Sequence, residues 1–280
     1  MHEFVIQTPL GAIAGLRNGR EGAPRVLALH GWLDNAASFV PLAPYLDDVD
    51  LVAIDLPGHG RSAHLAPGAD YSFAGALHSV LDAADALEWD RFALLGHSMG
   101  AGIGSLVAAG CPQRIERGVF IEALGALAEV PERTVKRMRE AVAATRALPG
   151  KRLRVFPDVE PAIRARMQAN ALSEPVARLL VERGVVAVEG GYVWSSDPRL
   201  TLPTMTRMTE AQIRDLVQGI ECPARVIFAD PAQPYLPDAV RRERTALMPQ
   251  GELIVLPGGH HLHMEQPQHI AAAIGDFFSR

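Results

Sequence analysis

The sequence predicts an α/β protein, with a mostly parallel eight-stranded sheet, helices on both of its faces and a helical insertion. Apolar runs of strand length, such as RVLALH at 25–30 and LVAIDL at 51–56, alternate with helical patterns along much of the chain. Neither run alternates polar with apolar residues, which indicates strands buried on two faces, as in parallel sheets. Strands that alternate with helices imply a parallel sheet wound with right-handed crossovers.

The predicted strands and helices fall into two core segments, 1–123 and 222–280. In the first segment, strands are expected at 4–8, 12–16, 25–30, 51–56, 91–95 and 118–123, and helices at 37–46, 71–87 and 98–111. In the second segment, strands are expected at 226–229 and 253–256, and helices at 238–247 and 269–278.

The alternation of strands and helices breaks between residues 124 and 221. This stretch is mostly helical and richer in Arg, and no run in it has the pattern of a core strand. We therefore expect 124–221 to form a mainly helical cap, inserted after the sixth strand and lying over the carboxyl edge of the sheet.

Composition and charge exclude several classes of protein. The net charge is −5 and neither sign is gathered into long blocks, which argues against nucleic-acid binding and against a polybasic membrane contact. No apolar run reaches the roughly 20 residues that cross a bilayer, and no secretory signal is visible at the start. We expect a cytoplasmic monomer or homodimer that acts on a small molecule.

The strongest local signal is GHSMG at 96–100, which follows a predicted strand directly and opens a helix. A G-x-S-x-G pattern in this context is typical of a nucleophilic serine on a strained turn. Ser98 would then stand at a helix N-terminus, where amide groups and the helix dipole favour negative charge. The alternative is a serine that only caps the helix, with glycines required for packing.

Two backbone amides are candidates for stabilising the oxyanion of a tetrahedral intermediate. One is the N–H of Met99, immediately after the serine. The other is the N–H of Trp32, in the turn His30-Gly31-Trp32 that follows a predicted strand. The alternative for this second motif is a turn that only ends the strand.

A histidine near the carboxyl terminus is the candidate base. The segment GGHHLH at 258–263 follows the last predicted strand, so its loop can reach back to Ser98 across the carboxyl edge of the sheet. We assign the base to His260, which comes directly after the two glycines. His261 and His263 are expected to line the pocket or to cap the next helix.

Four motifs occur together in one known superfamily: HGW at 30–32, DLPGHGRS at 55–62, GHSMG at 96–100 and GGHHLHMEQP at 258–267. With them the chain resembles the α/β-hydrolase fold superfamily, in which the serine also precedes the histidine. With YVWSSDPRL at 192–200 in addition, it is more similar to the serine hydrolase-like proteins, a capped, esterase-like group. We interpret DLPGHGRS as a structural turn.

The acid of the triad has two candidates. The superfamily usually places it in the loop after the seventh strand, where Ala232 stands here and cannot serve. Asp230 lies about two residues earlier, although Asp before Pro is also a turn former. Glu122 ends the sixth strand, where some members carry the acid, and burying it unpaired would be costly. We favour Glu122 as the acid. The alternative is that its carboxylate is exposed at the end of the strand or is paired with an arginine of the cap.

These residues predict a serine hydrolase that cleaves a small carboxylic ester through an acyl-enzyme, with no cofactor. Amide, thioester and carbon–carbon bond hydrolysis are alternatives, and so is a non-catalytic binding protein that has lost the acid. Histidines and carboxylates do not gather at metal-ligand spacings along the sequence, so no metal is expected. Candidate residues of the substrate pocket are His97, Tyr192, Trp194, Met205, Met208 and His261.

Overall fold

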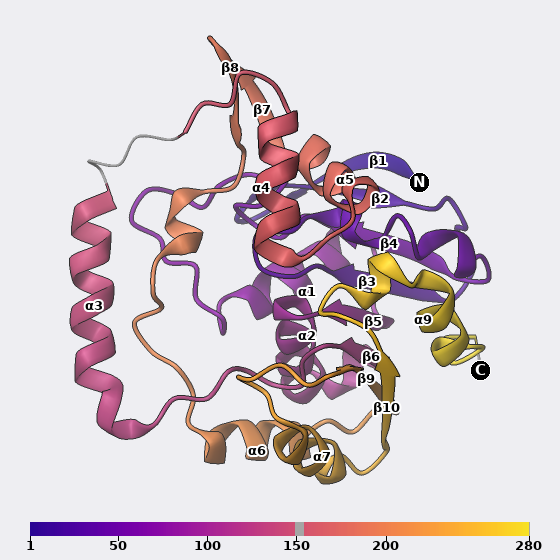
Figure 1. Cartoon of the computed structure of the whole chain (residues 1–280). Helices are drawn as coiled ribbons and strands as arrows, with labels where there is room; N and C mark the ends of the chain where they lie inside the picture. The colour runs from indigo at the N-terminus through magenta and orange to yellow at the C-terminus, as the bar shows by residue number, and fades with distance from the viewer. Residues whose placement is uncertain (149–153, 280) are drawn as a thin grey trace.

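The computed structural model describes residues 1–148 and 154–279, and its centre is an eight-stranded sheet (Figure 1). β1 pairs antiparallel with β2, and β2 with β4, whereas the other neighbours are parallel, so the predicted mostly parallel sheet is confirmed. In order across the sheet, the strands are β1 (His2–Thr8), β2 (Gly11–Arg17), β4 (Asp50–Ile54), β3 (Arg25–Leu29), β5 (Phe92–His97), β6 (Ile115–Ile121), β9 (Ala224–Asp230) and β10 (Gly251–Pro257).

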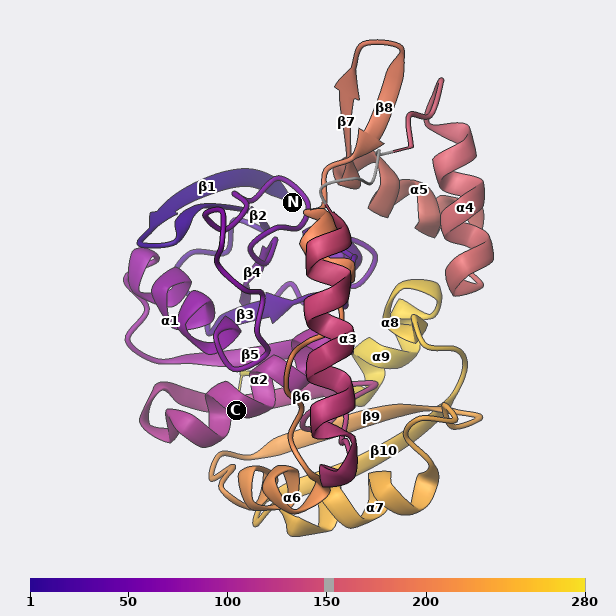
Figure 2. The same cartoon turned by 90° about the vertical axis from the view of Figure 1, so that its left-hand side faces the viewer.

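Helices cover both faces of the sheet, as predicted, and can be followed in Figure 2. Successive residues of β3 point to opposite faces. Leu27 packs into a hydrophobic cluster with α1 (Ala76–Ala86) and α2 (Met99–Gly110). Val26 packs into a second cluster with α9 (Pro267–Ile274). Within the described ranges, every helix is too short or too polar to span a membrane.

The stretch 37–46, predicted as a short helix, instead forms two 3₁₀ turns, Ala36–Phe39 and Ala43–Tyr45. Pro41 and Pro44 explain the difference. Proline supplies no amide N–H and its ring clashes with the preceding turn, so a regular α-helix cannot continue through this stretch.

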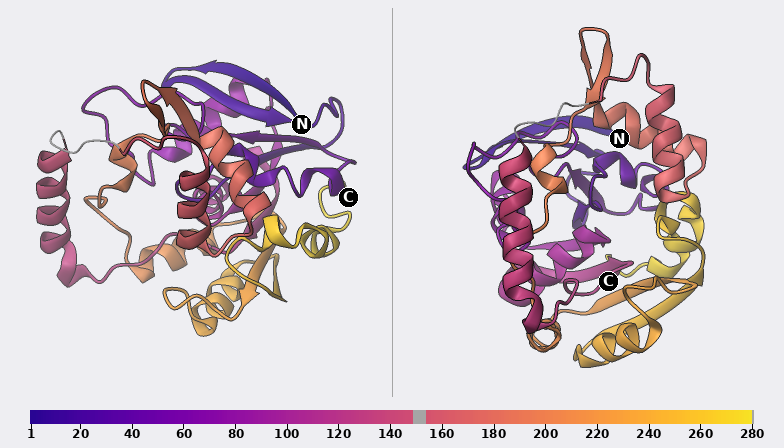
Figure 3. Two further views of the ribbon diagram at one scale, coloured as in Figure 1. Left: turned by 45° about the horizontal axis from the view of Figure 1, so that its top comes forward. Right: turned by 60° about the vertical axis from the view of Figure 1, so that its left-hand side comes forward.

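The segment between β6 and β9 holds a β-hairpin that the sequence analysis does not predict. Its two strands, β7 (Val185–Val188) and β8 (Gly191–Trp194), are joined by a turn with Gly190 at φ +85° and Gly191 at +142°. Figure 3 shows α3 standing apart from α4 and α5. The main helices of the segment are α3 (Thr134–Ala147), α4 (Glu160–Asn170) and α5 (Glu174–Gly184).

A further helix, α6 (Glu210–Gln218), lies in the range predicted as cap but packs with the core. Its Ile213 and Val217 are fully buried in the cluster that holds α1 and α2. The helix therefore belongs to the layer of core helices, next to α7 (Asp238–Leu247). Helical periodicity alone does not distinguish a core helix from a cap helix, which explains the difference.

Buried polar contacts hold α4 and α5 to the core. Arg183 of α5 forms an ion pair at 2.9 Å with Asp55, which follows β4, and both side chains are buried. Arg166 of α4 forms an ion pair with the buried Asp34, which follows β3. These two carboxylates fix α4 and α5 near the carboxyl edge of the sheet.

Candidate active site

Ser98 stands between β5 and α2 in a strained backbone conformation, with φ 51° and ψ −116°. Residues other than glycine rarely adopt such angles, and they persist only where the surroundings enforce them. The flanking glycines allow the turn to close. A Cβ on Gly100 would lie 2.0 Å from the carbonyl oxygen of Leu29, and one on Gly96 would lie 2.6 Å from the nitrogen of Ala101.

His260, in the loop after β10, lies between Ser98 and Glu122. Its Nε2 is 2.9 Å from Ser98 Oγ, and its Nδ1 is 2.9 Å from Glu122 Oε2. A carboxylate only accepts hydrogen bonds, so Nδ1–H donates to Glu122 and Nε2 is left to accept from the Ser98 hydroxyl. The three side chains thus form one continuous chain of hydrogen bonds.

Glu122, directly after β6, is held in place through both of its oxygens. Oε1 accepts from the backbone N–H of Ala229 at 2.6 Å, while Oε2 faces His260. The backbone N–H of Glu122 donates to the carbonyl of Ile227, and its φ is 62°, a second strained position. The Nη2 of the buried Arg241 lies 4.0 Å from Oε1. This buried carboxylate is therefore both paired and oriented.

The structure places Asp230, the other candidate acid, at the exposed end of β9. Among the described residues, it forms no hydrogen bond or ion pair with the ring of His260, whose Nδ1 faces Glu122 instead.

The two residues predicted to supply oxyanion amides lie in the turns that end β3 and β5. Met99 is the first residue of α2, so its N–H has no partner within the helix. Trp32 lies in the turn after β3, and its indole Nε1 donates to the carbonyl of Leu200 at 2.9 Å. This contact links the turn to the segment between β6 and β9.

Comparison with known proteins identifies the family. Residues 24–158 match the family described as alpha/beta hydrolase fold. The human serine hydrolase-like protein 2 is 30% identical, with 98% of this chain and 93% of that protein covered. The chain belongs to the α/β-hydrolase superfamily. This hydrolase is also 30% identical to a serine hydrolase-like protein of Danio rerio, with 98% of this chain and 87% of the relative covered.

Two solved structures resemble this α/β-hydrolase over nearly its whole length. A hypothetical protein of Pseudomonas aeruginosa PAO1 is 39% identical with a TM-score of 0.94, and the match covers 100% of both chains. A thioesterase domain from the curacin biosynthetic pathway is 26% identical with a TM-score of 0.85, and 98% of each chain is covered.

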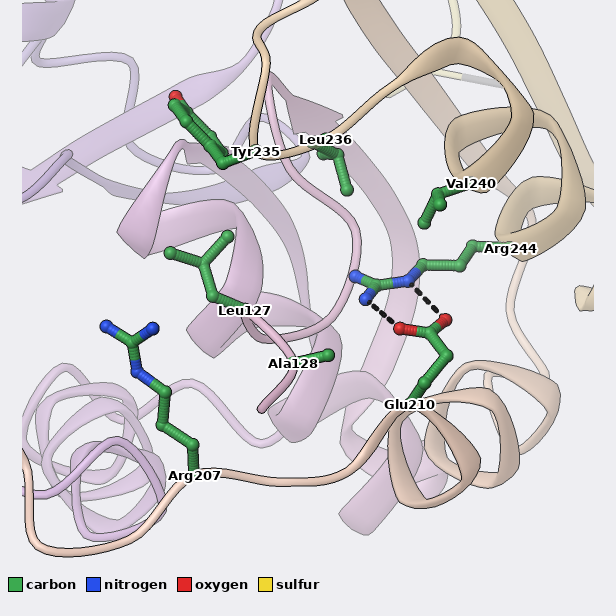
Figure 4. Close-up of a pocket in the computed structure, with 8 residues that line it drawn as sticks. All are labelled: Leu127, Ala128, Arg207, Glu210, Tyr235, Leu236, Val240 and Arg244. Atoms are coloured by element: carbon green, nitrogen blue, oxygen red, sulfur yellow. Dashed lines mark hydrogen bonds and ion pairs between the residues drawn. The ribbon is translucent and has the colours of Figure 1, made fainter. Parts of the chain in front are cut away.

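Tyr235, whose hydroxyl lies beside the His260 ring, lines a cavity of about 240 Å³ (Figure 4). Tyr235, in its wall, has its hydroxyl 3.5 Å from Nδ1 of His260. Burial, and then the negative charge of Glu122, raise the pKa of Tyr235, so the phenol stays protonated at neutral pH. Sequence reasoning missed Tyr235, because a tyrosine in a proline-rich loop carries no motif. The lining residues are Leu127, Ala128, Arg207, Glu210, Tyr235, Leu236, Val240 and Arg244.

None of the six residues predicted for the substrate pocket lines this cavity. Trp194 lines a much smaller hollow, between α5 and the turn after β3, and packs edge-on against Phe156. Tyr192 pairs with Phe156 through the backbone. Met205 is exposed, and Met208 packs against the core cluster. The pattern of apolar residues predicted that some of these side chains are buried. It did not predict which part of the protein they pack against.

His97 and His261, the other two predicted pocket residues, are both buried, His97 at the end of β5 and His261 next to His260 in the loop after β10. The Nε2–H of His97 donates to the backbone carbonyl of His260 at 2.8 Å. Burial, and then the neighbouring His263, hold the pKa of His97 well below its usual range, so the ring stays neutral. These histidines support the loop.

Three buried side chains form a group that sequence spacing does not reveal. One ligand atom each of Asp34, His97 and His261 lies within 4.8 Å of the others, so these residues could hold a metal ion. The lack of metal-ligand spacings in the sequence therefore does not exclude a metal site, because residues distant in the sequence meet here. The second oxygen of Asp34 is paired with Arg166, whose positive charge opposes a further cation.

Proposed function

We propose that this hydrolase cleaves a small carboxylic ester or a related acyl compound, with Ser98 as the nucleophile. The observation that carries the proposal is the continuous chain from Glu122 through His260 to Ser98, with both contacts at 2.9 Å. A nucleophile within hydrogen-bond reach of a base, which a third group orients, is the arrangement that activates a serine.

The proposed reaction has two steps. His260 Nε2 takes the hydroxyl proton while Ser98 Oγ attacks the carbonyl carbon, and the resulting oxyanion is stabilised by the amides of Met99 and Trp32. The intermediate collapses to an acyl-enzyme as His260 returns the proton to the leaving group. Water then attacks the acyl-enzyme with His260 as its base, which releases the acid and restores Ser98. Glu122 keeps Nδ1 protonated throughout and stabilises the imidazolium that forms in each step.

The size of the cavity supports a small substrate. Its volume of about 240 Å³ lies below the roughly 300–1,000 Å³ of sites for drug-sized ligands. Thioesters belong to the substrate class, and the likeness to the curacin thioesterase domain supports including them. We further propose that the segment between β6 and β9 acts as a cap over the site. A cytoplasmic location and a monomeric or homodimeric state stay predictions.

A non-catalytic binding protein is the competing hypothesis. Its basis is the lack of a carboxylate near Ala232, where the superfamily usually places the acid. Glu122 weakens this basis, because its carboxylate occupies the position beside Nδ1 of His260 that an acid requires. We therefore favour catalysis.

Labelling with a fluorophosphonate probe tests the proposal, because the probe reacts only with an activated serine. We expect the wild-type protein to be labelled on Ser98, and Ser98→Ala and His260→Ala to lose the label. Ser279→Ala, at an exposed serine far along the chain, is the matched control and should keep it. A folded wild-type protein that is neither labelled nor able to hydrolyse p-nitrophenyl acetate would overturn the proposal.

A further inference from the structure

The cavity that Tyr235 lines contains three charged side chains, and two of them neutralise each other (Figure 4). Glu210 forms two hydrogen bonds with Arg244, at 3.0 and 2.6 Å. Arg244 also donates to the carbonyls of Leu124 and Ala126, so it is fully engaged in structural contacts. The third charged side chain, Arg207, is therefore the one that is available to a ligand.

Arg207 forms no hydrogen bond or ion pair with any residue in 1–148 or 154–279. The carboxylate that acts on it is Glu129, which is already shared by two other arginines. Glu129 Oε2 accepts from Arg137 at 2.5 Å and lies 3.5 Å from Nε of Arg133. The backbone N–H of Glu129 donates to the carbonyl of Met208, which brings these side chains beside Arg207.

The surroundings of Arg207 carry an excess of positive charge. Three guanidinium groups, of Arg133, Arg137 and Arg207, are balanced by the single carboxylate of Glu129. Partial burial, and then repulsion from Arg137 and Arg133, lower the pKa of Arg207 below its ordinary value. An anion that enters the cavity would relieve this repulsion and satisfy the guanidinium at once.

Arg207 is connected to the proposed active site through Tyr235, which lines the same cavity. Figure 4 shows its guanidinium pointing from the segment before α6 toward the side of the cavity where Leu127 and Tyr235 lie, away from the Arg244–Glu210 pair. Tyr235 in turn contacts the His260 ring. A substrate whose carbonyl lies at Ser98 and whose chain follows the apolar wall would thus bring its far end toward Arg207.

We propose that Arg207 binds a carboxylate of the substrate, so that the natural substrate is an acyl compound with a carboxylate at the end remote from the scissile carbonyl. This inference rests on the proposed hydrolysis at Ser98. The planar fork of a guanidinium matches the two oxygens of a carboxylate, and such charge-assisted pairs are the strongest hydrogen bonds of proteins. Arg207 is then a residue that determines specificity.

The test compares two esters that differ only at the remote end, the mono-p-nitrophenyl ester of adipate and p-nitrophenyl hexanoate. The measured quantity is the ratio of their kcat/KM values. We expect Arg207→Gln to lower the adipate-to-hexanoate ratio by about ten- to a hundredfold, the range for a lost hydrogen bond to a charged group. Arg207→Glu should lower it further, because it places a negative charge opposite the carboxylate.

The matched control is Arg20→Gln, which removes the same charge from an exposed arginine after β2, at the opposite edge of the sheet. It should keep the wild-type ratio. Equal ratios in Arg207→Gln and Arg20→Gln would overturn the inference, because a general charge effect would then explain the preference.

A second measurement requires no turnover and separates this inference from the proposed function. Calorimetry gives the Kd of monoethyl adipate for the Ser98→Ala protein. We expect the Kd to rise at least about tenfold when Arg207→Gln is added, again from the lost charge-assisted bond. An unchanged Kd overturns the role of Arg207, and so does a failure of monoethyl adipate to bind Ser98→Ala. Failure of fluorophosphonate to label Ser98 overturns the hydrolase mechanism instead.

Discussion

The carboxylate of Glu122 meets the imidazole of His260 at 2.9 Å, although 138 residues separate them along the chain. Glu122 follows β6, His260 follows β10, and β9 lies between these two strands in the sheet. The backbone N–H of Ala229 in β9 holds the other oxygen of Glu122. The orientation of the proposed base therefore depends on the register of three adjacent strands.

The role of Glu122 as the orienting acid is tested by Glu122→Gln. The amide keeps the size of the side chain but removes the charge that favours a proton on Nδ1 and stabilises the imidazolium. We expect kcat/KM for a p-nitrophenyl ester to fall by about 10³-fold or more, in line with the roughly 10⁴-fold loss for the equivalent change in a serine protease. The melting temperature, measured alongside, shows whether the variant is folded.

Asp230→Asn is the matched control, since it neutralises the other candidate acid. Asp230 is exposed at the end of β9, so we expect its substitution to change kcat/KM by less than about twofold. If Asp230→Asn lost far more activity than Glu122→Gln, the acid would have been assigned to the wrong residue.

Sequence patterns predicted those features of the protein that depend on residues close together in the chain. The apolar runs identify the core strands, because burial on both faces leaves them without polar positions. GHSMG at 96–100 identifies the turn at Ser98, because only glycine fits where Gly100 passes the carbonyl of Leu29. The carboxylate of Glu122 at the end of an apolar strand indicated a partner, and the structure supplies one in His260.

Contacts between distant segments could not be predicted in this way. Asp34 meets His97 and His261 only because β3, β5 and β10 end at the same edge of the sheet. Arg207 and Tyr235 come to one cavity from the loops that precede α6 and α7. Neither has a sequence pattern, since the cavity depends on how the segment between β6 and β9 packs, which a single sequence does not specify.

The turn at Ser98 should not tolerate a side chain at Gly100. A Cβ there would lie 2.0 Å from the carbonyl oxygen of Leu29, which belongs to the backbone and cannot move aside as a flexible side chain could. We expect Gly100→Ala to abolish fluorophosphonate labelling of Ser98 and to lower the free energy of unfolding by about 3 kcal/mol or more, as overpacking does in a core.

Gly110→Ala, at the other end of α2, provides the control for the same substitution in the same helix. Its Cβ would meet only the Cδ1 of Leu77, at 3.3 Å, and alanine favours a helix over glycine by about 1 kcal/mol. We expect this variant to be labelled like the wild type. Normal labelling of Gly100→Ala would show that the turn is looser than its geometry indicates.

The buried ion pair between Arg183 and Asp55 should be essential for stability. Their side chains are 5% and 0% exposed, and Arg183→Met would leave the Asp55 carboxylate buried with its main partner removed. Breaking a buried pair in this way costs about 3–5 kcal/mol. Urea unfolding followed by circular dichroism should detect a loss of this size.

Arg178→Met removes the same charge from the same helix, α5, but from a partly exposed position. Arg178 is 34% exposed and pairs with Glu160 and Glu174, which are 47% and 56% exposed. Exposed pairs contribute about 1 kcal/mol or less, so we expect a correspondingly small loss. Comparable losses in the two arginine variants would mean that the packing of α5, rather than the buried pair, determines the stability.

Stability should fall in mild acid because buried histidines resist protonation in the folded state. Burial lowers the pKa of His59 from 6.5 to about 4. Between these values the unfolded chain binds a proton that the folded protein does not, so the free energy of unfolding decreases as the pH falls from 6.5 toward 4. In this range, each such histidine lowers the free energy of unfolding by about 1.4 kcal/mol for each pH unit of acidification. Above the pKa of the unfolded chain, this loss is absent.

His59→Gln should remove one of these contributions. The free energy of unfolding is measured with urea at several pH values between 4 and 6.5. We expect it to fall less steeply with decreasing pH than in the wild type, with a slope that is smaller by about 1.4 kcal/mol per pH unit. His78→Gln, at an exposed position of α1, should keep the wild-type slope. The ring of His59 packs against His30 and not against a residue of the proposed triad, so the effect should appear in stability without a change in which residue the fluorophosphonate labels. Identical slopes in His59→Gln and His78→Gln would mean that the His59 ring accepts a proton as readily in the folded protein as in the unfolded chain.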